Sequence, residues 1–285
     1  MPSIRDSLRR TDGSTELPRV SEWLLGAFAR YTHWYLQRHF DAMRVSTSGW
    51  LPDNENGVPK VVYLNHASWW DPLVCLHLSR HLFSRHRAFA PIDAQAIAKY
   101  AFFRRLGFFG VEPDSPRGAA RFFRVAHEIL SHPWHVLWVT PQGRFADARE
   151  RPLAFKNGLG HLASRLGKGA NPAADRPRRF HFVPLAIEYT FWHEPRPEIL
   201  LRFGEPLEVH AATSHHDEPE VWTARLEARL EAAMDGLAEE ARLRQPDAFL
   251  PLLRGRTGVG GIYDLWRRAK SLWRRQPFDP KHGRL

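Results

Sequence analysis

Apolar side chains near the start of the chain recur at the spacing of a helix. Between residues 18 and 43 they fall mostly three or four positions apart, and arginines occupy several of the polar positions between them. Residues at this spacing share one helical face, so the segment is predicted to form one long helix or a helical pair. The apolar positions are Val20, Trp23, Leu24, Leu25, Phe28, Tyr31, Trp34, Tyr35 and Phe40.

Beyond this helix, short apolar runs alternate with longer amphipathic segments. The run at 58–65 is apolar in succession rather than in alternation, which is typical of a strand buried on both faces. Further strands are predicted at 89–92, 108–111 and 136–140, and helices begin near 69–72 and cover 95–106, 117–130 and 155–166. Because strands that alternate with helices favour parallel pairing, we expect an α/β fold with a central, mostly parallel sheet flanked by helices.

The last third of the chain combines a strand pair with helices. Strands are predicted at 180–189 and 198–209, followed by a charged helix at 220–244. Near the end, Leu265, Trp266, Ala269, Leu272 and Trp273 share a helical face surrounded by lysines and arginines. Such a helix is typical either of a lipid interface or of a docked helix with a solvated basic face. We divide the chain into a flexible tail (1–17), a main domain (18–245) and a basic amphipathic extension (246–285).

Composition narrows the classes of partner. The 285 residues carry a formal net charge of +10, which favours an anionic partner such as a phospholipid surface, a nucleic acid or a phosphorylated substrate. The single cysteine, Cys75, excludes an internal disulfide framework and fits a reducing cytoplasm. The opening residues include basic side chains but no continuous apolar core, so we expect no cleaved secretory signal, and no run of about 20 apolar residues is present. Any membrane contact is therefore expected to be peripheral or shallow.

Candidate chemistry follows the buried strand at 58–65. His66 comes directly after it, and Asp71 stands five positions on, where a helix is predicted to begin. Across such a turn the carboxylate can accept one imidazole N–H and leave the other nitrogen free as a general base. The alternative is a structural histidine beside an aspartate that stabilises the start of a helix.

These residues resemble the first motif of the lysophospholipid and glycerophosphate acyltransferase family, which is His-x4-Asp commonly preceded by Asn. Three further segments are similar to the later family motifs and follow in the family's order. Residues 106–112 resemble the second motif, 140–144 with 155–158 resemble the third, and 183–187 resemble the fourth. One spacing is a weak signal, but four motifs in order are much stronger.

The resemblance implies an α/β domain with an acyl-chain groove and an N-terminal helix that contacts the bilayer at the cytoplasmic face. It implies that His66 and Asp71 are catalytic and that a fatty acyl group moves from acyl-CoA or acyl-carrier protein to a lipid hydroxyl, with lysophosphatidate as the default acceptor. No cofactor and no metal are expected. The implied substrate-binding residues are Asn65, Glu112, Arg117, Gln142, Gly143, Arg144, Lys156, Gly158 and Pro184.

Two departures from the family pattern concern the acceptor. Glu112 is followed by proline instead of arginine, and the nearest arginine is Arg117. In the third motif the usual glutamate is Gln142, and Arg144 stands in place of threonine. An uncharged amide suits a neutral hydroxyl or sugar as well as a phosphate ester, so a glycolipid or glycosylated lipid is a rival acceptor.

The alternative to an acyltransferase is a basic protein that has no enzymatic activity. Its basic surface would bind membranes or nucleic acid, which explains the charge but leaves the ordered motifs unexplained. We therefore expect no nucleic-acid partner. The cluster His215, His216 and Asp217 lacks a second pair of ligands at a recognisable spacing, so we interpret it as a solvated loop rather than a metal site.

Overall fold

The fold is seen in a computed structural model that describes residues 17–50, 52, 57–168, 179–210 and 217–255. The tail at 1–16, His215, His216 and the amphipathic segment at 265–273 lie outside the described residues. Within the described part, nine strands form one sheet in the order β4-β3-β5-β2-β6-β7-β1-β9, and β8 pairs with β6. The strands are β1 (Ala42–Ser46), β2 (Lys60–Leu64), β3 (Arg87–Asp93), β4 (Phe108–Val111), β5 (His135–Val139), β6 (Arg179–Thr190), β7 (Glu198–Phe203), β8 (Leu207–His210) and β9 (Phe249–Arg254).

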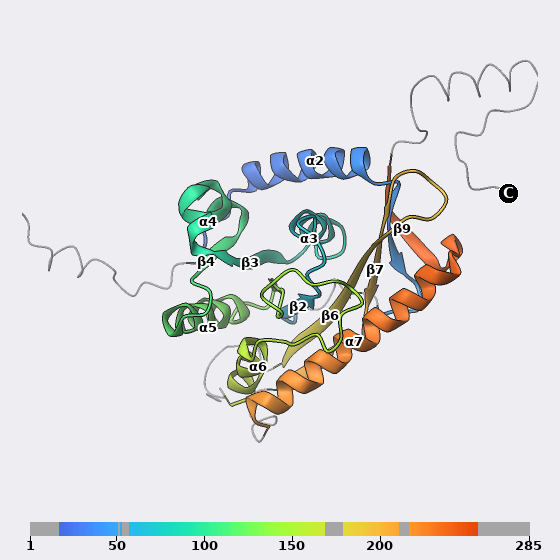
Figure 1. Ribbon diagram of the computed structural model, residues 1–285. Coiled ribbons are helices and arrows are strands. Elements are labelled where there is room, and N and C mark those ends of the chain that lie inside the picture. Colours follow the sequence, from blue (N-terminus) through green and yellow to red (C-terminus); the bar gives the residue numbers. More distant parts are fainter. Residues whose placement is uncertain (1–16, 51, 53–56, 169–178, 211–216, 256–285) are drawn as a thin grey trace, which may run out of the picture.

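Helices cover both faces of this sheet (Figure 1). On one face lie α2 (Glu22–His39) and α3 (Asp71–His81), and on the other lie α5 (Pro116–Leu130), α6 (Gly158–Lys168) and α7 (Pro219–Leu243). The shorter elements are α4 (Ala94–Lys99) and the 3₁₀ helices η1 (Ala101–Leu106) and η2 (Pro246–Ala248).

The strand β2 lies in the middle of the sheet, between β5 and β6, and is parallel to both. Its side chains alternate between the two cores: Val61 and Tyr63 pack with residues of α5, α6 and α7, whereas Val62 and Leu64 pack with residues of α2 and α3. This double burial explains the continuous apolar run. The strand pairs β3–β4, β3–β5 and β1–β7 are also parallel, which confirms the predicted mostly parallel α/β fold.

Three predicted elements have different bounds in the structure. The helix predicted to reach residue 43 ends at His39, because Phe40 is extended and the chain enters β1, a five-residue strand buried between β7 and β9. The segment 95–106 divides into α4 and η1, and Gly107, with φ +98°, ends the second. The segment 198–209 divides into β7 and β8, which pair with successive parts of β6.

The sheet continues beyond residue 245, where the sequence analysis ended the main domain. The strand β9 pairs antiparallel with β1 and buries Phe249 and Leu253. Short edge strands of this kind carry little periodicity, so the pattern of apolar residues did not indicate it. The described part of the 246–285 segment therefore belongs to the same sheet as the motifs.

The helices α6 and α7 cross closely at Gly160. A Cβ atom at this position would lie 2.1 Å from Thr223 Oγ1 and 2.2 Å from the Pro219 carbonyl oxygen, whereas a Cβ atom at Gly158 in the same helix would meet nothing within 4 Å. Small residues at such crossings let two helical backbones approach each other, and overpacking a crossing displaces one of them.

We expect Gly160→Ala to lower the free energy of unfolding by about 1–3 kcal/mol, because α6 must move away from α7. The matched control Gly158→Ala should be neutral or raise stability by up to about 1 kcal/mol, since alanine lowers the entropy of the unfolded chain. Urea denaturation followed by circular dichroism measures both. Equal stability of the two variants would contradict the close crossing.

Candidate functional site

The imidazole of His66 and the carboxylate of Asp71 meet at the carboxyl end of β2. His66 follows the strand and Asp71 is the first residue of α3, and His66 Nδ1 lies 2.7 Å from Asp71 Oδ2. Asp71 is 1% exposed, so its carboxylate is shielded from water. The tight strand-to-helix turn, with Pro72 in the first turn of α3, is what brings residues five positions apart into contact.

Two more donors hold the Asp71 carboxylate. The backbone N–H of Ser68 donates to Oδ2 at 3.1 Å, and the hydroxyl of Tyr189 at the end of β6 donates to Oδ1 at 2.6 Å. Burial and then the nearby Asp71 carboxylate raise the pKa of Tyr189, so the hydroxyl keeps its proton and remains a donor. Tyr189 was not predicted from sequence, because it lies 118 residues from Asp71 in an apolar strand whose pattern carries no signal of the contact.

The backbone of His66 is held by the loop after β5. Its backbone N–H donates to Gln142 Oε1 at 3.2 Å, and its carbonyl accepts from the N–H of Ala146 at 2.9 Å. The ring of Phe145 packs against the imidazole with a centroid distance of 4.2 Å. Within the described residues Nε2 forms no hydrogen bond, so the dyad has one nitrogen available to a ligand.

The side chain of Gln142 is buried and forms its hydrogen bonds within the protein. It is 3% exposed, and besides accepting from His66 it donates from Nε2 to the Leu153 carbonyl at 3.2 Å. A glutamate carboxylate at this position would accept from His66 but would face the Leu153 carbonyl without a proton to donate. The amide therefore ties the loop to the dyad.

A cavity of about 540 Å³ opens beside the dyad, between α3 and the strands β3, β4 and β5. His66, Asp71, Thr140 and Gly143 stand among its lining residues, and most of the rest are apolar. The apolar residues include Leu64, Pro72, Leu76, Phe89, Ile92, Leu106, Phe108, Val111, Trp138 and Val139. A cavity of this volume and lining suits an apolar ligand with a polar reacting group at one end.

Gly143 and Lys156 lie together at the mouth of this site. Gly143 has φ +63°, and a Cβ atom there would lie 2.9 Å from Lys156 Cε, so both the backbone angle and the lysine favour glycine. The N–H of Gly143 donates to the Thr140 carbonyl at 3.0 Å. That donor is therefore engaged in the loop and is not free to stabilise an oxyanion.

The cations near the site are paired. Lys156 Nζ lies 2.6 Å from Asp114 Oδ1, and Arg144 forms an ion pair with Glu150. Both pairs are exposed to solvent, which limits what each contributes to stability. Neither side chain presents a free positive charge in this arrangement.

The other predicted substrate-binding residues lie outside the cavity beside the dyad. Asn65 is 1% exposed, and its amide exchanges two hydrogen bonds with the backbone of Ile187, which ties β2 to β6. Glu112 and Arg117 are exposed at the start of α5, Gly158 begins α6, and Pro184 is buried in the sheet opposite Tyr63. None of these five residues lines the 540 Å³ cavity.

The described residues were also compared with the requirements of a metal site and of a membrane-spanning helix. Across 17–50, 57–168, 179–210 and 217–255, no group of three or more His, Cys, Asp or Glu side chains is arranged to hold a metal ion. Within the same ranges, no helix is both long enough and apolar enough to cross a bilayer.

Comparison with known proteins identifies the family. A family model described as Acyltransferase matches residues 44–188, which is 145 of the 285 residues and includes the dyad, the loop of Gln142 and most of β6. The crystal structure of the 1-acyl-sn-glycerophosphate (LPA) acyltransferase PlsC from Thermotoga maritima is similar in fold, with a TM-score of 0.51 and 17% sequence identity over 79% of this chain and 82% of that chain. The comparison with curated proteins found no match. The chain belongs to the acyltransferase family and is an enzyme of that class.

Proposed function

We propose that the enzyme moves a fatty acyl group from a thioester to a lipid hydroxyl, with His66 as general base and Asp71 as its partner. The observation that carries this proposal is the 2.7 Å contact between His66 Nδ1 and Asp71 Oδ2 beside an apolar cavity of about 540 Å³. A polar dyad at the end of an apolar cavity is what transfer of a long acyl chain requires, because the chain leaves water while its carbonyl stays beside the base.

In the proposed reaction a proton moves from the acceptor hydroxyl to His66 and then to the leaving thiolate. His66 Nε2 removes the proton of the acceptor hydroxyl, and the oxygen attacks the thioester carbonyl carbon. When the C–S bond breaks, the imidazolium returns the proton to the leaving thiolate, so the products are an ester and a free thiol. Asp71 stabilises the imidazolium and fixes its tautomer, as the carboxylate does in a hydrolytic triad.

Lysophosphatidate is the proposed default acceptor, because the chain resembles this family and the similar PlsC structure is that of a 1-acyl-sn-glycerophosphate acyltransferase. Its phosphate would require a cation at the site. Arg144 and Lys156 are the candidates beside the dyad, and each would have to exchange its carboxylate partner, Glu150 or Asp114, for the phosphate. Solvent-exposed ion pairs exchange partners at small cost.

A glycolipid or glycosylated lipid is the second candidate acceptor, and a second cavity supports it. This cavity has a volume of about 500 Å³ and is lined by Ala67, Glu188, Tyr189 and residues of α7. Burial raises the pKa of the Glu188 carboxyl, and the one arginine in the lining, Arg149, pairs with Asp147. The Glu188 carboxyl can form hydrogen bonds with sugar hydroxyls, and among the described residues no unpaired cation lines this cavity to bind a phosphate, so the cavity suits a neutral headgroup.

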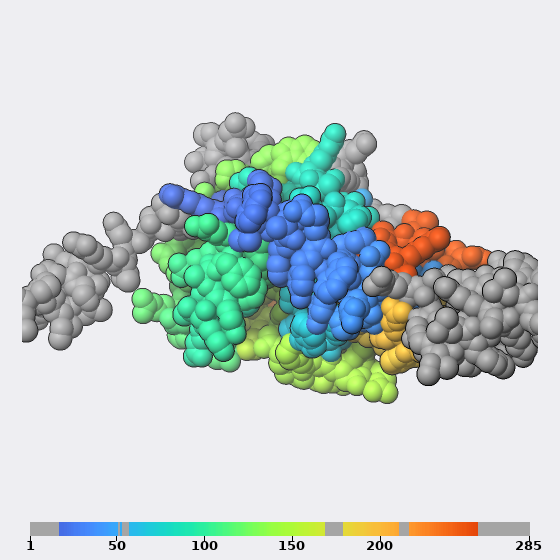
Figure 2. All heavy atoms as spheres, turned by 90° about the horizontal axis from the view of Figure 1, so that it is seen from above, coloured from blue at the N-terminus to red at the C-terminus, as the bar shows by residue number. Residues whose placement is uncertain are grey.

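We further propose that the enzyme works at the cytoplasmic face of a membrane, with α2 against the lipid. The helix carries Trp23, Tyr31 and Trp34, which are 78%, 48% and 49% exposed. Figure 2 looks onto this face, where α2 in blue lies beside α4 and η1 in green. There Tyr100 and Phe102 are exposed beside Arg104 and Arg105. Exposed aromatic and basic side chains together are typical of surfaces that bind the headgroup region.

Replacing His66 by alanine tests the chemistry. Transfer from a fatty acyl thioester should fall by at least roughly 10²- to 10⁴-fold, because the proton acceptor is lost, while the far-ultraviolet circular dichroism stays that of the wild type. The assay uses labelled acyl-CoA with lysophosphatidate and a lysoglycolipid side by side, and products are identified by mass. Undiminished turnover in the variant would reject His66 as the base, and the preferred acceptor distinguishes the two candidates.

Replacing Tyr189 by phenylalanine tests the positioning of Asp71. Loss of the 2.6 Å hydrogen bond lets the carboxylate rotate away from His66, so kcat should fall roughly 10- to 100-fold while KM for both substrates stays unchanged. Tyr63→Phe is the matched control, since the Tyr63 hydroxyl is buried in β2 with no partner among the described residues. If both variants keep the wild-type kcat, Tyr189 has no positioning role.

Replacing Trp23 and Trp34 together by alanine tests the membrane surface. Partition of the protein onto phospholipid vesicles should fall about tenfold or more, because two large apolar side chains no longer leave water. Sedimentation with vesicles measures the bound fraction. Val221→Ala, at a residue 42% exposed on α7 across the sheet from α2, is the control and should partition like the wild type. Equal partition of the double variant would show that α2 is not the contact.

A further inference from the structure

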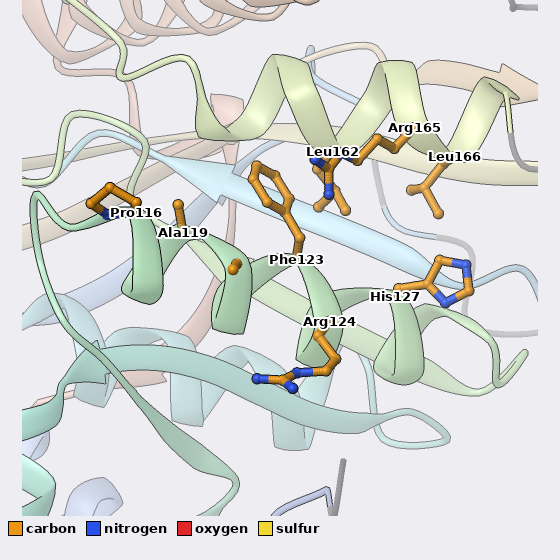
Figure 3. A pocket seen from close by; sticks show the side chains of 9 residues that line it. Pro116, Ala119, Phe123, Arg124, His127, Leu162, Arg165 and Leu166 are labelled. Atoms are coloured by element: carbon orange, nitrogen blue, oxygen red, sulfur yellow. The ribbon is translucent and has the colours of Figure 1, made fainter. Parts of the chain in front are cut away.

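A groove that is separate from both cavities described above lies between α5 and α6, on the face of the sheet opposite α2. It has a volume of about 550 Å³ and none of the residues discussed at the dyad lines it. Figure 3 shows Phe123 of α5 pointing toward α6, with Leu162 and Leu166 facing it from α6. Ala119 and Ala120 are exposed along the same side of α5. The floor of the groove is therefore apolar.

Arg124 of α5 and Arg165 of α6 line this groove. Arg117, Arg121 and Arg124 are exposed on α5 at spacings of four and three, and so share one helical face. Across the groove, the guanidinium of Arg165 on α6 lies 4.4 Å from the centroid of the Phe123 ring. In Figure 3 Arg165 and Arg124 lie on opposite sides of the groove.

The positive charge of these two helices is not neutralised within the described part of the chain. Together α5 and α6 contain four arginines and Lys168 against a single carboxylate, Glu128. None of the four arginines forms an ion pair with a described residue. An apolar strip between unpaired cations is complementary to an acidic helix that presents apolar side chains.

The groove also lies beside the site of the proposed reaction. Pro113 lines the apolar cavity at the dyad, and Pro116, three residues later, lines the groove. Three residues span at most about 10 Å, so at the start of α5 the groove and the cavity come within reach of one flexible arm. The opposite face, which carries α2, is the proposed membrane surface, so α5 and α6 lie on the side of the described domain that faces away from it.

We propose that the α5–α6 groove docks an acidic carrier protein that delivers the fatty acyl thioester on a flexible arm. This inference rests on the proposed acyl transfer and assigns its donor. The arginines bind the carboxylates of the carrier, Phe123 and the alanines contact its apolar side chains, and the arm passes Pro113 to reach His66.

The test reverses the charge of two arginines in the variant R121E/R124E, and neutralises them in R121A/R124A. The matched control R225E/R242E makes the same change in net charge on α7, where both arginines are exposed and paired with neighbouring carboxylates. Each protein is assayed with acyl-carrier protein and with acyl-CoA of the same chain length, and with lysophosphatidate as acceptor.

For R121E/R124E we expect KM for acyl-carrier protein to rise roughly tenfold or more, with a smaller rise for R121A/R124A, because both lose electrostatic attraction. The kcat/KM for acyl-CoA should change less than twofold in both, and the control should resemble the wild type. Binding of the unacylated carrier protein to the wild type, measured by calorimetry, should weaken as salt rises.

The proposal is overturned if R121E/R124E keeps the wild-type KM for acyl-carrier protein, or if the wild type uses acyl-CoA but neither binds nor uses the carrier. An equal loss with acyl-CoA would assign the arginines to the coenzyme's phosphates instead. Loss of binding to anionic vesicles alone would assign them to lipid. Failure of the acyl-transfer proposal is a separate result, in which the carrier still binds in calorimetry but neither donor is consumed.

Discussion

The candidate site depends on one buried carboxylate. Asp71 accepts hydrogen bonds from His66, from the backbone of Ser68 and from Tyr189, so three separate segments must be in register before the dyad forms. Those segments are the end of β2, the start of α3 and the end of β6, and the parallel pairing of β2 with β6 sets their relative height. A carboxylate removed from water is stabilised by such donors, so the fold and the dyad support each other.

The elements that bury a continuous or periodic apolar surface could be predicted from sequence. The strand β2, the helix α5 and the long helix α7 were placed within a few residues because their patterns follow directly from double burial or helical spacing. The strands β1 and β9 were missed or left outside the main domain, since both are short and their partners come from distant parts of the chain. Long-range pairing of this kind leaves no local pattern.

The candidate site, like the fold, could be predicted only in part from the sequence. The five-residue spacing of His66 and Asp71 was visible, and the two side chains meet. The third donor, Tyr189, was not visible because its contact crosses the sheet. The motif residues that were expected to touch substrate have different surroundings in the structure. Gly143 and Lys156 lie at the dyad, whereas Asn65 and Gln142 use their amides to tie strands and loops together.

The placement of the apolar cavity in the sheet has a consequence for how the family can diversify. One wall of the cavity belongs to β4, a four-residue strand at the edge of the sheet, while His66 follows β2 in its middle. Substitutions in β4 and η1 change the shape of this space without touching the hydrogen bonds of Asp71. Under the proposed function, in which the cavity holds the acyl chain, preference for tails of different length can evolve independently of the dyad.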